Sequence, residues 1–343
     1  MSTLLVTGAA GFIGSNFVRM LLNRGEDVRL VAFDKLTYAG NLANLQDLLA
    51  AHPDKLTFVK GDICNADDVA TAMDENGVTH VVHFAAESHV DRSIMSSGPF
   101  VQTNVVGTQI LLDEAKKRDC ERFLMVSTDE VYGTLPEDDK SVMFTEDTPL
   151  APNSPYSASK CGGDVLVRSY FETHGMPVLT TRCSNNYGPY HFPEKLIPLF
   201  VTNLMEDKQV PLYGDGMNIR DWLYVEDHCD AIWNVLTKAK PGEVYNVGGN
   251  NEMTNRRITE IVLEAMGKDW DTSVKYVQDR AGHDRRYAID ASKIKRDLGW
   301  EPKHRFEDAI KTTIQWYRDN QDWWRAIKSG EYMKYYDEQY AGR

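Results

Sequence analysis

The sequence predicts an α/β fold with a doubly wound parallel sheet and a smaller domain interleaved with it. Three observations carry this prediction. Short apolar runs alternate with helical patterns through the first half of the chain, a glycine-rich turn follows the first apolar run, and the composition shifts toward Pro, Gly and aromatic residues after Tyr187. Strands that alternate with helices in this way form a parallel sheet covered on both faces.

The individual elements follow from hydrophobic periodicity. Strands are expected at 4–7, 28–33, 56–59, 80–84, 123–126, 178–181 and 243–247. Helices are expected at 12–23, 67–76, 104–118, 156–174 and 197–206. The C-terminal part is expected to form a small helical cap that contains Trp316, Trp323, Trp324, Tyr332, Tyr335 and Tyr336.

The domain organisation is therefore predicted to be interleaved rather than consecutive. Residues 1–187 plus 224–249 are expected to form the sheet domain. Residues 188–223 plus 250–343 are expected to form the cap that binds the substrate.

Composition excludes several classes of function. The 343 residues carry a formal net charge of -13 and no Lys/Arg-rich run, which disfavours nucleic acid as a partner. No apolar run approaches the ~20 residues of a membrane span, and the N-terminus does not resemble a signal peptide. Five scattered cysteines indicate neither disulfides nor a metal site, so a cytoplasmic protein without a metal is expected. His89, Asp91 and Arg92 are interpreted as structural hydrogen-bonding residues rather than metal ligands.

The strongest early motif is the turn Gly8, Gly11 and Gly14, directly after a strand and at the start of a helix. Such a turn brings backbone N–H groups and the positive end of a helix dipole to a pyrophosphate. Asp34 ends the second strand, 20 residues after Gly14, where a carboxylate can hold an adenosine ribose. The motif predicts a Rossmann-type dinucleotide site. Asp34 favours NAD over NADP, and the adjacent Lys35 weakens that preference slightly.

A second motif indicates redox chemistry at an alcohol. Tyr156 and Lys160 are four residues apart, so they share one helix face, and the ammonium is expected to lower the pKa of the tyrosine toward neutrality. Thr128, at the end of the fifth strand, adds a hydroxyl. With the glycine turn, these residues resemble the extended branch of the short-chain dehydrogenase/reductase superfamily over the whole chain.

Asp129 and Glu130 narrow the expectation further. Alcohol oxidation needs neither carboxylate, whereas elimination of water needs both an acid and a base. With the segments 34–42, 86–93, 182–189 and 280–287, this pair makes the chain similar to the dTDP-glucose 4,6-dehydratase family.

That resemblance implies roles for individual residues. The catalytic set is Thr128, Asp129, Glu130, Tyr156 and Lys160. NAD is expected against Gly8, Gly11, Phe12, Ile13, Gly14, Asp34, Lys35, Leu36, Thr37, Asp62, Ile63, Phe84, Ala85, Ala86, Ser88, Thr103, Tyr156, Lys160 and Asn186. The substrate dTDP-glucose is expected against Ser88, Thr128, Asn185, Lys195, Leu196, Pro211, Leu212, Tyr213, Arg220, Asn255, Asp279, Arg280 and His283.

Alternatives remain open at this point. The nucleotide of the sugar substrate could be UDP or CDP, and a nucleotide-sugar 4-epimerase or decarboxylase would share the cofactor and the fold. A non-enzymatic dinucleotide sensor is disfavoured because Tyr156 and Lys160 are both present. The resemblance also implies a homodimer that pairs helices at 101–117 and 156–173.

Overall fold

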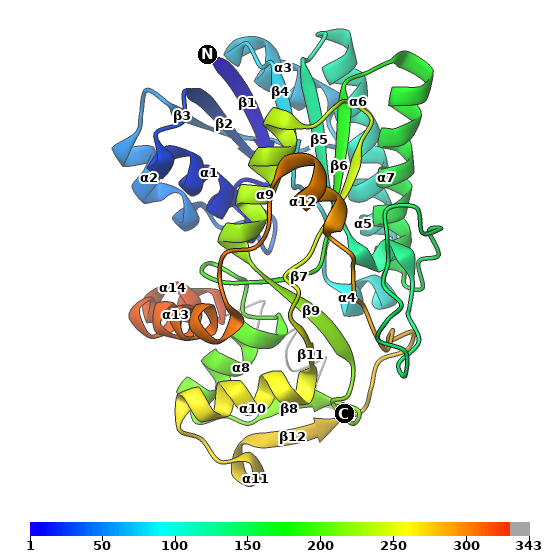
Figure 1. The fold of residues 1–343 in the computed structure, drawn as a ribbon. Coiled ribbons are helices and arrows are strands. Elements are labelled where there is room, and N and C mark those ends of the chain that lie inside the picture. The colour runs from blue at the N-terminus through cyan, green and yellow to red at the C-terminus, as the bar shows by residue number, and fades with distance from the viewer. Residues whose placement is uncertain (330–343) are drawn as a thin grey trace.

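The computed structural model describes residues 1–329, and its centre is a seven-stranded parallel sheet (Figure 1). The strands lie in the order β10-β6-β5-β4-β1-β2-β3. Their bounds are β1 (Ser2–Thr7), β2 (Val28–Asp34), β3 (Leu56–Lys60), β4 (His80–His83), β5 (Arg122–Thr128), β6 (Val178–Cys183) and β10 (Val244–Val247). The predicted fold class is confirmed. The strand order reverses between β1 and β4, and ligands of such sheets bind outside the carboxyl ends of the strands at this point.

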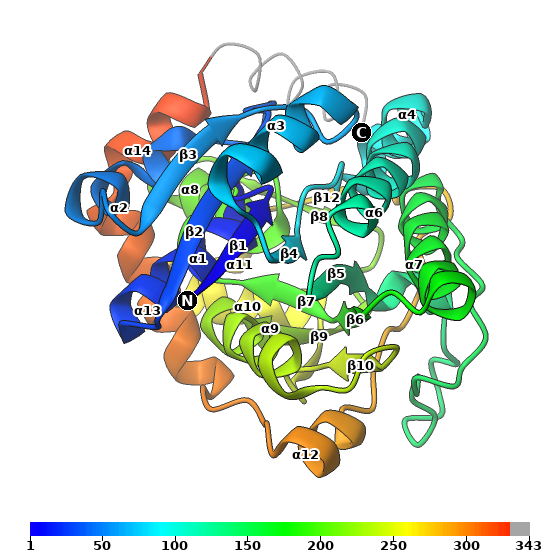
Figure 2. The same ribbon diagram turned by 90° about the horizontal axis from the view of Figure 1, so that it is seen from above.

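Helices cover both faces of the sheet (Figure 2). On one face are α3 (Ala66–Asn76), α6 (Thr108–Lys117) and α7 (Pro155–His174); on the other are α1 (Phe12–Arg24), α9 (Val225–Lys238) and α12 (Ser292–Leu298). Each face has its own apolar core: Val69 and Leu111 pack with Phe123 on the first, and Phe17 packs with Ile232 on the second. This burial on both faces explains why the strands read as continuous apolar runs.

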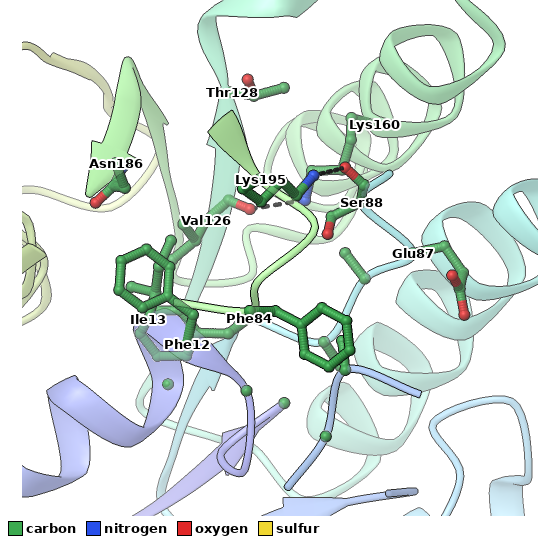
Figure 3. Close-up of a pocket in the computed structure, with 18 of the residues that line it drawn as sticks. Phe12, Ile13, Phe84, Glu87, Ser88, Val126, Thr128, Lys160, Asn186 and Lys195 are labelled. Atoms are coloured by element: carbon green, nitrogen blue, oxygen red, sulfur yellow. Dashed lines mark hydrogen bonds between the residues drawn. The ribbon is translucent and has the colours of Figure 1, made fainter. Parts of the chain in front are cut away.

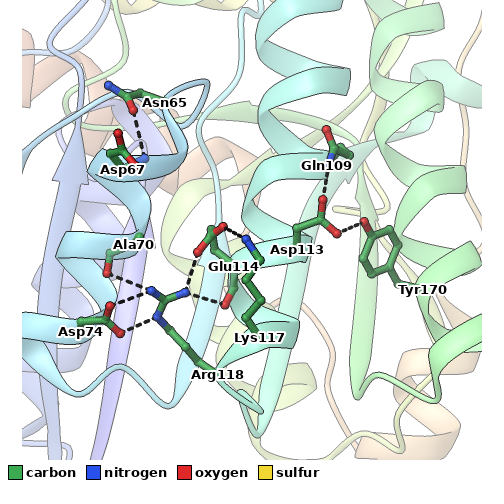
Figure 4. A network of polar contacts seen from close by, with 10 residues as sticks. All are labelled: Asn65, Asp67, Ala70, Asp74, Gln109, Asp113, Glu114, Lys117, Arg118 and Tyr170. Atoms are coloured by element: carbon green, nitrogen blue, oxygen red, sulfur yellow. Dashed lines mark hydrogen bonds and ion pairs between the residues drawn. The ribbon is translucent and has the colours of Figure 1, made fainter.

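Charged contacts tie the helices of the first face together (Figure 4). Arg118 donates to Asp74 of α3 at 2.6 and 2.7 Å and to the Glu114 carboxylate at 2.6 Å. Farther along α6, Asp113 accepts a hydrogen bond from the Tyr170 hydroxyl of α7 at 2.6 Å. These contacts lie at the helix surfaces, so they orient the helices without taking part in the site.

The second part of the molecule has its own core and two small sheets. One sheet has the order β11-β9-β7 and the other pairs β12 with β8. Its strands are β7 (Asn185–Tyr187), β8 (Val210–Tyr213), β9 (Ile219–Tyr224), β11 (Glu252–Thr254) and β12 (Val274–Val277). Its helices are α8 (Leu196–Met205), α10 (Asn255–Met266), α11 (Trp270–Ser273), α13 (Phe306–Asp319) and α14 (Gln321–Ile327).

The sequence predicted a helical C-terminal cap. The structure shows that this part also contains the strands β11 and β12. Strands of three and four residues, such as β11 and β12, are too short to leave a period-two pattern. Trp324 is fully buried, and the Tyr190 ring makes a tilted contact with Trp316 and an edge-on contact with Trp323. Tyr332, Tyr335 and Tyr336 lie outside the described residues.

Several elements were not predicted individually. In the first half they include η1 (Leu42–Asn44), α2 (Gln46–Ala51), α4 (Val90–Met95), α5 (Gly98–Val101) and the 3-10 turn η3 (Asp129–Tyr132), and in the second half the longest helices among them are α9, α10 and α13. The predicted helix at 104–118 is a π-helical segment η2 (Gln102–Gly107) that continues into α6.

In the described part of the chain, no helix combines the length and apolarity that crossing a membrane requires. All five cysteines are free thiols. Among residues 1–329, no group of three or more His, Cys, Asp or Glu side chains could hold a metal ion.

Candidate active site

A cavity of about 380 Å³ lies at the carboxyl ends of the parallel strands, between the sheet and the second part of the molecule (Figure 3). Every predicted cofactor residue except Leu36 lines it, as do all five predicted catalytic residues. Of the predicted substrate residues, those lining it are Ser88, Thr128, Asn185, Lys195 and Leu196. The structure therefore joins the two motifs in one cavity.

The glycine turn is shaped by close backbone packing. Gly8 has a φ of +68°, and a Cβ there would lie 2.6 Å from the backbone nitrogen of Ala85. A Cβ on Gly14 would lie 2.3 Å from the Gly8 carbonyl oxygen. Gly11 precedes α1, and no side chain caps that helix. The open N-terminus of a 13-residue helix thus faces the cavity, which is the arrangement that suits a pyrophosphate.

Backbone groups fix the carboxylate of Asp34 at the end of β2. Its oxygens accept hydrogen bonds from the Ala10 nitrogen at 2.9 Å and the Leu36 nitrogen at 2.8 Å. Burial raises the pKa of Asp34, and these two hydrogen bonds oppose the rise. The carboxylate is tied to the glycine turn, so the ribose-binding and phosphate-binding parts of a dinucleotide site form one unit.

The two residues after Asp34, Lys35 and Leu36, lie in different surroundings. The Lys35 ammonium lies 2.6 Å from the Asp62 carboxylate, so it has an acidic partner. Leu36 has a φ of 57° and packs against the apolar core instead of lining the cavity. An uncapped helix end and a fixed, buried carboxylate at the matching strand end together fit a dinucleotide.

Tyr156 and Lys160 project from α7 into the cavity. The Lys160 ammonium donates to the Val126 carbonyl at 2.8 Å, and burial lowers its pKa to about 8. Among the chain's own groups, burial, Glu130, Cys183 and Asp129 raise the pKa of Tyr156 well above its usual value. This is the opposite of the predicted lowering, because a sequence spacing cannot show desolvation or carboxylates from another element. The Thr128 hydroxyl opposes the rise through a side-chain hydrogen bond.

Asp129 and Glu130 lie on η3 and line the same cavity. Burial, Glu130 and Asp221 raise the pKa of Asp129 well above its usual value, and its Oδ2 has no hydrogen-bond partner among the described residues. Burial also raises the pKa of Glu130, but Arg280, Arg220 and Lys195 oppose that rise. The two carboxyl groups therefore differ in electrostatic setting: one is biased toward the acid form, and the other is near three cations.

The cations lie around Glu130 on several elements. Lys195 donates to the Ser88 carbonyl at 2.7 Å and lines the cavity (Figure 3). Arg220 is buried outside the lining, where it donates to the Ile219 and Asp284 carbonyls at 2.7 and 2.8 Å and stacks on Tyr287. Burial lowers the pKa of Arg220.

The remaining predicted substrate residues form a layer beyond the cavity lining. The Tyr213 hydroxyl donates to Asp91 at 3.1 Å, and Arg280 lies 3.7 Å from the same carboxylate. His283 is paired with Asp279 at 2.6 Å. Asn255 is buried at the start of α10, and Pro211 and Leu212 are buried in β8.

The segment His89–Arg92 joins this layer to the cavity. His89 lies 3.8 Å from the Glu194 carboxylate, and Arg92 lies 3.4 Å from it. These contacts fix the three side chains, and their structural role stays a prediction from the sequence.

Several lining residues were missed by sequence reasoning, among them Glu87, Cys183, His191 and Glu194. The His191 ring stacks on Phe12 with centroids 4.0 Å apart. These residues occur singly, outside any spacing pattern, so only the three-dimensional contacts reveal them. The one available signal was position: Glu87 and Cys183 follow or end predicted strands.

A Tyr–Lys helix face beside a dinucleotide turn defines a short-chain dehydrogenase/reductase of the extended type. A sequence model of the GDP-mannose 4,6 dehydratase family matches residues 5–313. The chain is 52% identical to a dTDP-glucose 4,6-dehydratase of Xanthomonas campestris pv. campestris (strain B100), over 97% of each chain. The chain belongs to this family of nucleotide-sugar 4,6-dehydratases.

Solved structures of proteins with the same name are similar to this chain in both sequence and fold. A dTDP-glucose 4,6-dehydratase from Bacillus anthracis str. Ames in complex with NAD is 51% identical, with a TM-score of 0.88 over 96% of this chain and 100% of that one. The Streptomyces venezuelae enzyme of the same name, with NAD and a second ligand bound, has a TM-score of 0.91 at 51% identity, over 95% and 100%. A UDP-glucose 4-epimerase of Thermus thermophilus with NAD is similar at 30% identity, with a TM-score of 0.84 over 93% and 99%.

Proposed function

We propose that the protein is an NAD-dependent dTDP-glucose 4,6-dehydratase, a hydro-lyase that forms dTDP-4-keto-6-deoxyglucose. The observation that carries this proposal is the pair Asp129 and Glu130 in the cavity that also holds Tyr156 and Lys160. Relatives at about half identity over nearly the whole chain bear the same name. The pair supplies the acid and the base that an epimerase does not need.

The first step is oxidation at C4 of the sugar. Tyr156, assisted by Thr128 and Lys160, takes the proton of the 4-hydroxyl. NAD, when bound, supplies a hydride acceptor and later returns the hydride, so no external oxidant is consumed. The Lys160 ammonium is fixed by the Val126 carbonyl one helix turn from Tyr156, and a cation there is proposed to favour the phenolate form of Tyr156.

The second step is elimination of water across C5 and C6. The new 4-ketone acidifies the C5 proton, which Glu130 removes. Asp129 gives its proton to the departing 6-hydroxyl, which leaves as water. Asp129, whose pKa is raised well above the usual value, keeps the proton that it must donate, and the cations near Glu130 favour the carboxylate that must accept one. Glu130, after exchanging its proton with solvent, then protonates C5, and return of the hydride to C6 completes the 4-keto-6-deoxy sugar. Asp129 regains a proton from solvent, and Tyr156 releases the one it took.

The diphosphate of the substrate requires positive charge in an acidic protein. Lys195, Arg220 and Arg280 provide it locally, and His283 and Asn255 extend the same layer. The predicted cap, 188–223 plus 250–343, is accordingly proposed to bind the nucleotide, and 1–187 plus 224–249 to bind NAD. Tyr213 and Pro211 are proposed to contact the base.

We further propose a homodimer in the cytoplasm. Ile94, Met95, Val101 and Val165 are exposed apolar residues on α4, α5 and α7, which pack together. A second copy covering this face would remove that apolar surface from water. Free thiols at all five cysteines suit a reducing compartment.

The experiment that tests the function is incubation of the NAD-loaded protein with dTDP-, UDP- and CDP-glucose, followed by mass and NMR analysis of the products. Loss of water from dTDP-glucose, with little reaction of the other two, is expected. A 4-epimer with no loss of water would contradict the dehydratase proposal, and faster turnover of UDP- or CDP-glucose would correct the nucleotide.

A further inference from the structure

Behind the cavity lies a buried polar network that the catalytic steps above do not use. It consists of Tyr132, Asp164, Arg182 and Asn246, and we call it the Arg182 network. The Tyr132 hydroxyl lies between Arg182 and Asn246: it accepts from the Arg182 Nη1 at 2.9 Å and donates to the Asn246 Oδ1 at 2.8 Å. All four residues are buried.

Arg182 is held in a fixed orientation. Its Nε and Nη2 donate to the two carboxylate oxygens of Asp164 at 2.8 and 2.9 Å. A bidentate pair of this kind restricts both distance and angle. With the guanidinium plane fixed in this way, one N–H of Nη1 is directed at the Tyr132 hydroxyl. Arg182 itself lies on β6, which is hydrogen-bonded to β5 on one side and to the edge strand β10 on the other.

The two partners of Arg182 lie on the two elements that carry the reacting groups. Asp164 follows Tyr156 and Lys160 at successive four-residue steps, so all three share one face of α7. Tyr132 is the last residue of η3, which begins with Asp129 and Glu130. The guanidinium thus joins the helix with the redox base to the turn with the elimination pair.

Other contacts hold η3 on its opposite side. The Tyr132 ring stacks on Phe144 with centroids 5.0 Å apart, and the Val131 carbonyl accepts from the Ala151 nitrogen at 3.0 Å. These contacts anchor η3 to the segment at 144–151. The Arg182 network instead connects η3 to α7, through side chains that are also fixed by the sheet.

We propose that Tyr132 and Arg182 are positioning residues that set the placement of Glu130 relative to Tyr156. This inference rests on the proposed dehydratase function. Oxidation uses Tyr156 and Lys160, which one helix holds together, and Thr128, which the central sheet holds at the end of β5. Elimination adds Glu130, which belongs to a different element and must reach the carbon next to the oxidised one. Displacement of η3 therefore slows elimination more than oxidation, because proton transfer needs close, aligned groups.

The test is Tyr132→Phe, which removes the hydroxyl and keeps the ring that stacks on Phe144. Tyr170→Phe is the matched control, since the Tyr170 hydroxyl of α7 also bonds a side chain of another element, Asp113, away from the cavity (Figure 4). Stopped-flow absorbance of reduced nicotinamide reports oxidation, product analysis reports loss of water, and calorimetry reports Tm. The dTDP-glucose reaction of the wild type is measured in parallel.

For Tyr132→Phe we expect a fall of about 10- to 100-fold in kcat for water loss, with KM nearly unchanged. Oxidation in the first turnover should stay near the wild-type rate, so reduced cofactor accumulates during turnover. Tyr170→Phe should leave kcat unchanged. Arg182→Lys, which keeps a cation near Asp164 but lacks the fork that reaches Tyr132, should give the same accumulation and covers the case in which Tyr132→Phe does not fold.

A lower Tm with unchanged kcat per folded protein would overturn the proposal, and so would equal losses in oxidation and elimination. Failure of the proposed function would be seen separately, as a wild-type protein that releases no 4-keto-6-deoxy sugar.

Discussion

The two halves of the cavity are built in different ways. On the β1–β2 side, the structure is made by backbone: Gly8 packs on Ala85, Gly14 packs on the Gly8 carbonyl, and Asp34 is held by main-chain nitrogens. On the side of η3 and the second part of the molecule, it is made by ionisable side chains, chiefly the buried Asp129 and Arg220 and the half-buried Glu130. The first half of the cavity is therefore defined mainly by the shape of the backbone, and the second half mainly by the ionisable side chains.

The two halves of the cavity are therefore expected to be sensitive to different changes, one to added atoms and the other to altered charge. A backbone-built site is sensitive to a single added methyl group but has few titrating groups. In a site built from ionisable side chains, the chemistry depends on the balance between carboxylates and cations and on their placement.

Glu130→Gln should give the largest effect, because it removes the elimination base without changing the shape of the site. Turnover to the 4-keto-6-deoxy product is expected to fall by on the order of 10²–10⁴. Oxidation at C4 should persist, and it is followed by the absorbance of reduced nicotinamide. Unchanged product formation would remove Glu130 from the mechanism.

Gly8→Ala should destabilise the backbone-built half. A non-glycine residue in the left-handed region costs roughly 1–2 kcal/mol, and a Cβ 2.6 Å from the Ala85 nitrogen adds a clash. Gly77→Ala is the control, with a φ of +60° and open space around the added atom. The free energy of unfolding should fall clearly more for Gly8→Ala; equal losses would mean that close packing at Gly8 contributes nothing.

Arg220→Ala should act through charge in the other half. Arg220 is proposed to bind the diphosphate, so loss of its charged, hydrogen-bonding group should raise KM by about 10-fold. Arg220 also lowers the pKa of Glu130, so its removal raises that pKa, and the acidic limb of the kcat profile moves to higher pH. Arg220→Lys keeps the charge and should keep the limb in place. A limb that stays in place in Arg220→Ala would show that Arg220 does not tune Glu130.

The smallest effect is a pH dependence of stability from buried histidines. Burial lowers the pKa of His83 and of His228 to about 3. Because the unfolded chain takes up these protons near pH 6.5, stability is lost as pH falls below 6.5 and continues to fall toward pH 3. Each histidine should contribute about 1 kcal/mol of loss by pH 5.5, measurable by denaturant titration. A flat profile between pH 6.5 and 5.5 would contradict this.

The difference between the two halves of the cavity also explains which site residues could be predicted from the sequence. The glycine turn, Asp34 and the Tyr156–Lys160 pair are local patterns whose geometry follows from a strand end or a helix turn, so their positions in the cavity were predicted. Leu36 was the exception, because its positive φ turns it into the core. The layer of Arg220, Tyr213 and Arg280 depends on contacts between segments more than 60 residues apart, such as Arg220 with Asp284, and no local pattern encodes those.

The pKa of Tyr156 is a second property that the local sequence pattern could not predict. The spacing to Lys160 correctly places both side chains in the cavity, but the direction of the shift is set by burial and by Glu130 and Asp129. Those groups approach Tyr156 only through the packing of η3 against α7.

The central claim is that the cavity oxidises C4, eliminates water across C5 and C6, and returns the same hydrogen to C6. Incubation of dTDP-glucose with the protein in heavy water, followed by NMR of the product, tests it most directly. The account predicts deuterium at C5 and a C6 methyl group that carries the hydrogen from C4. A product without C5 deuterium, or a sugar epimerised at C4 with its 6-hydroxyl intact, would contradict it.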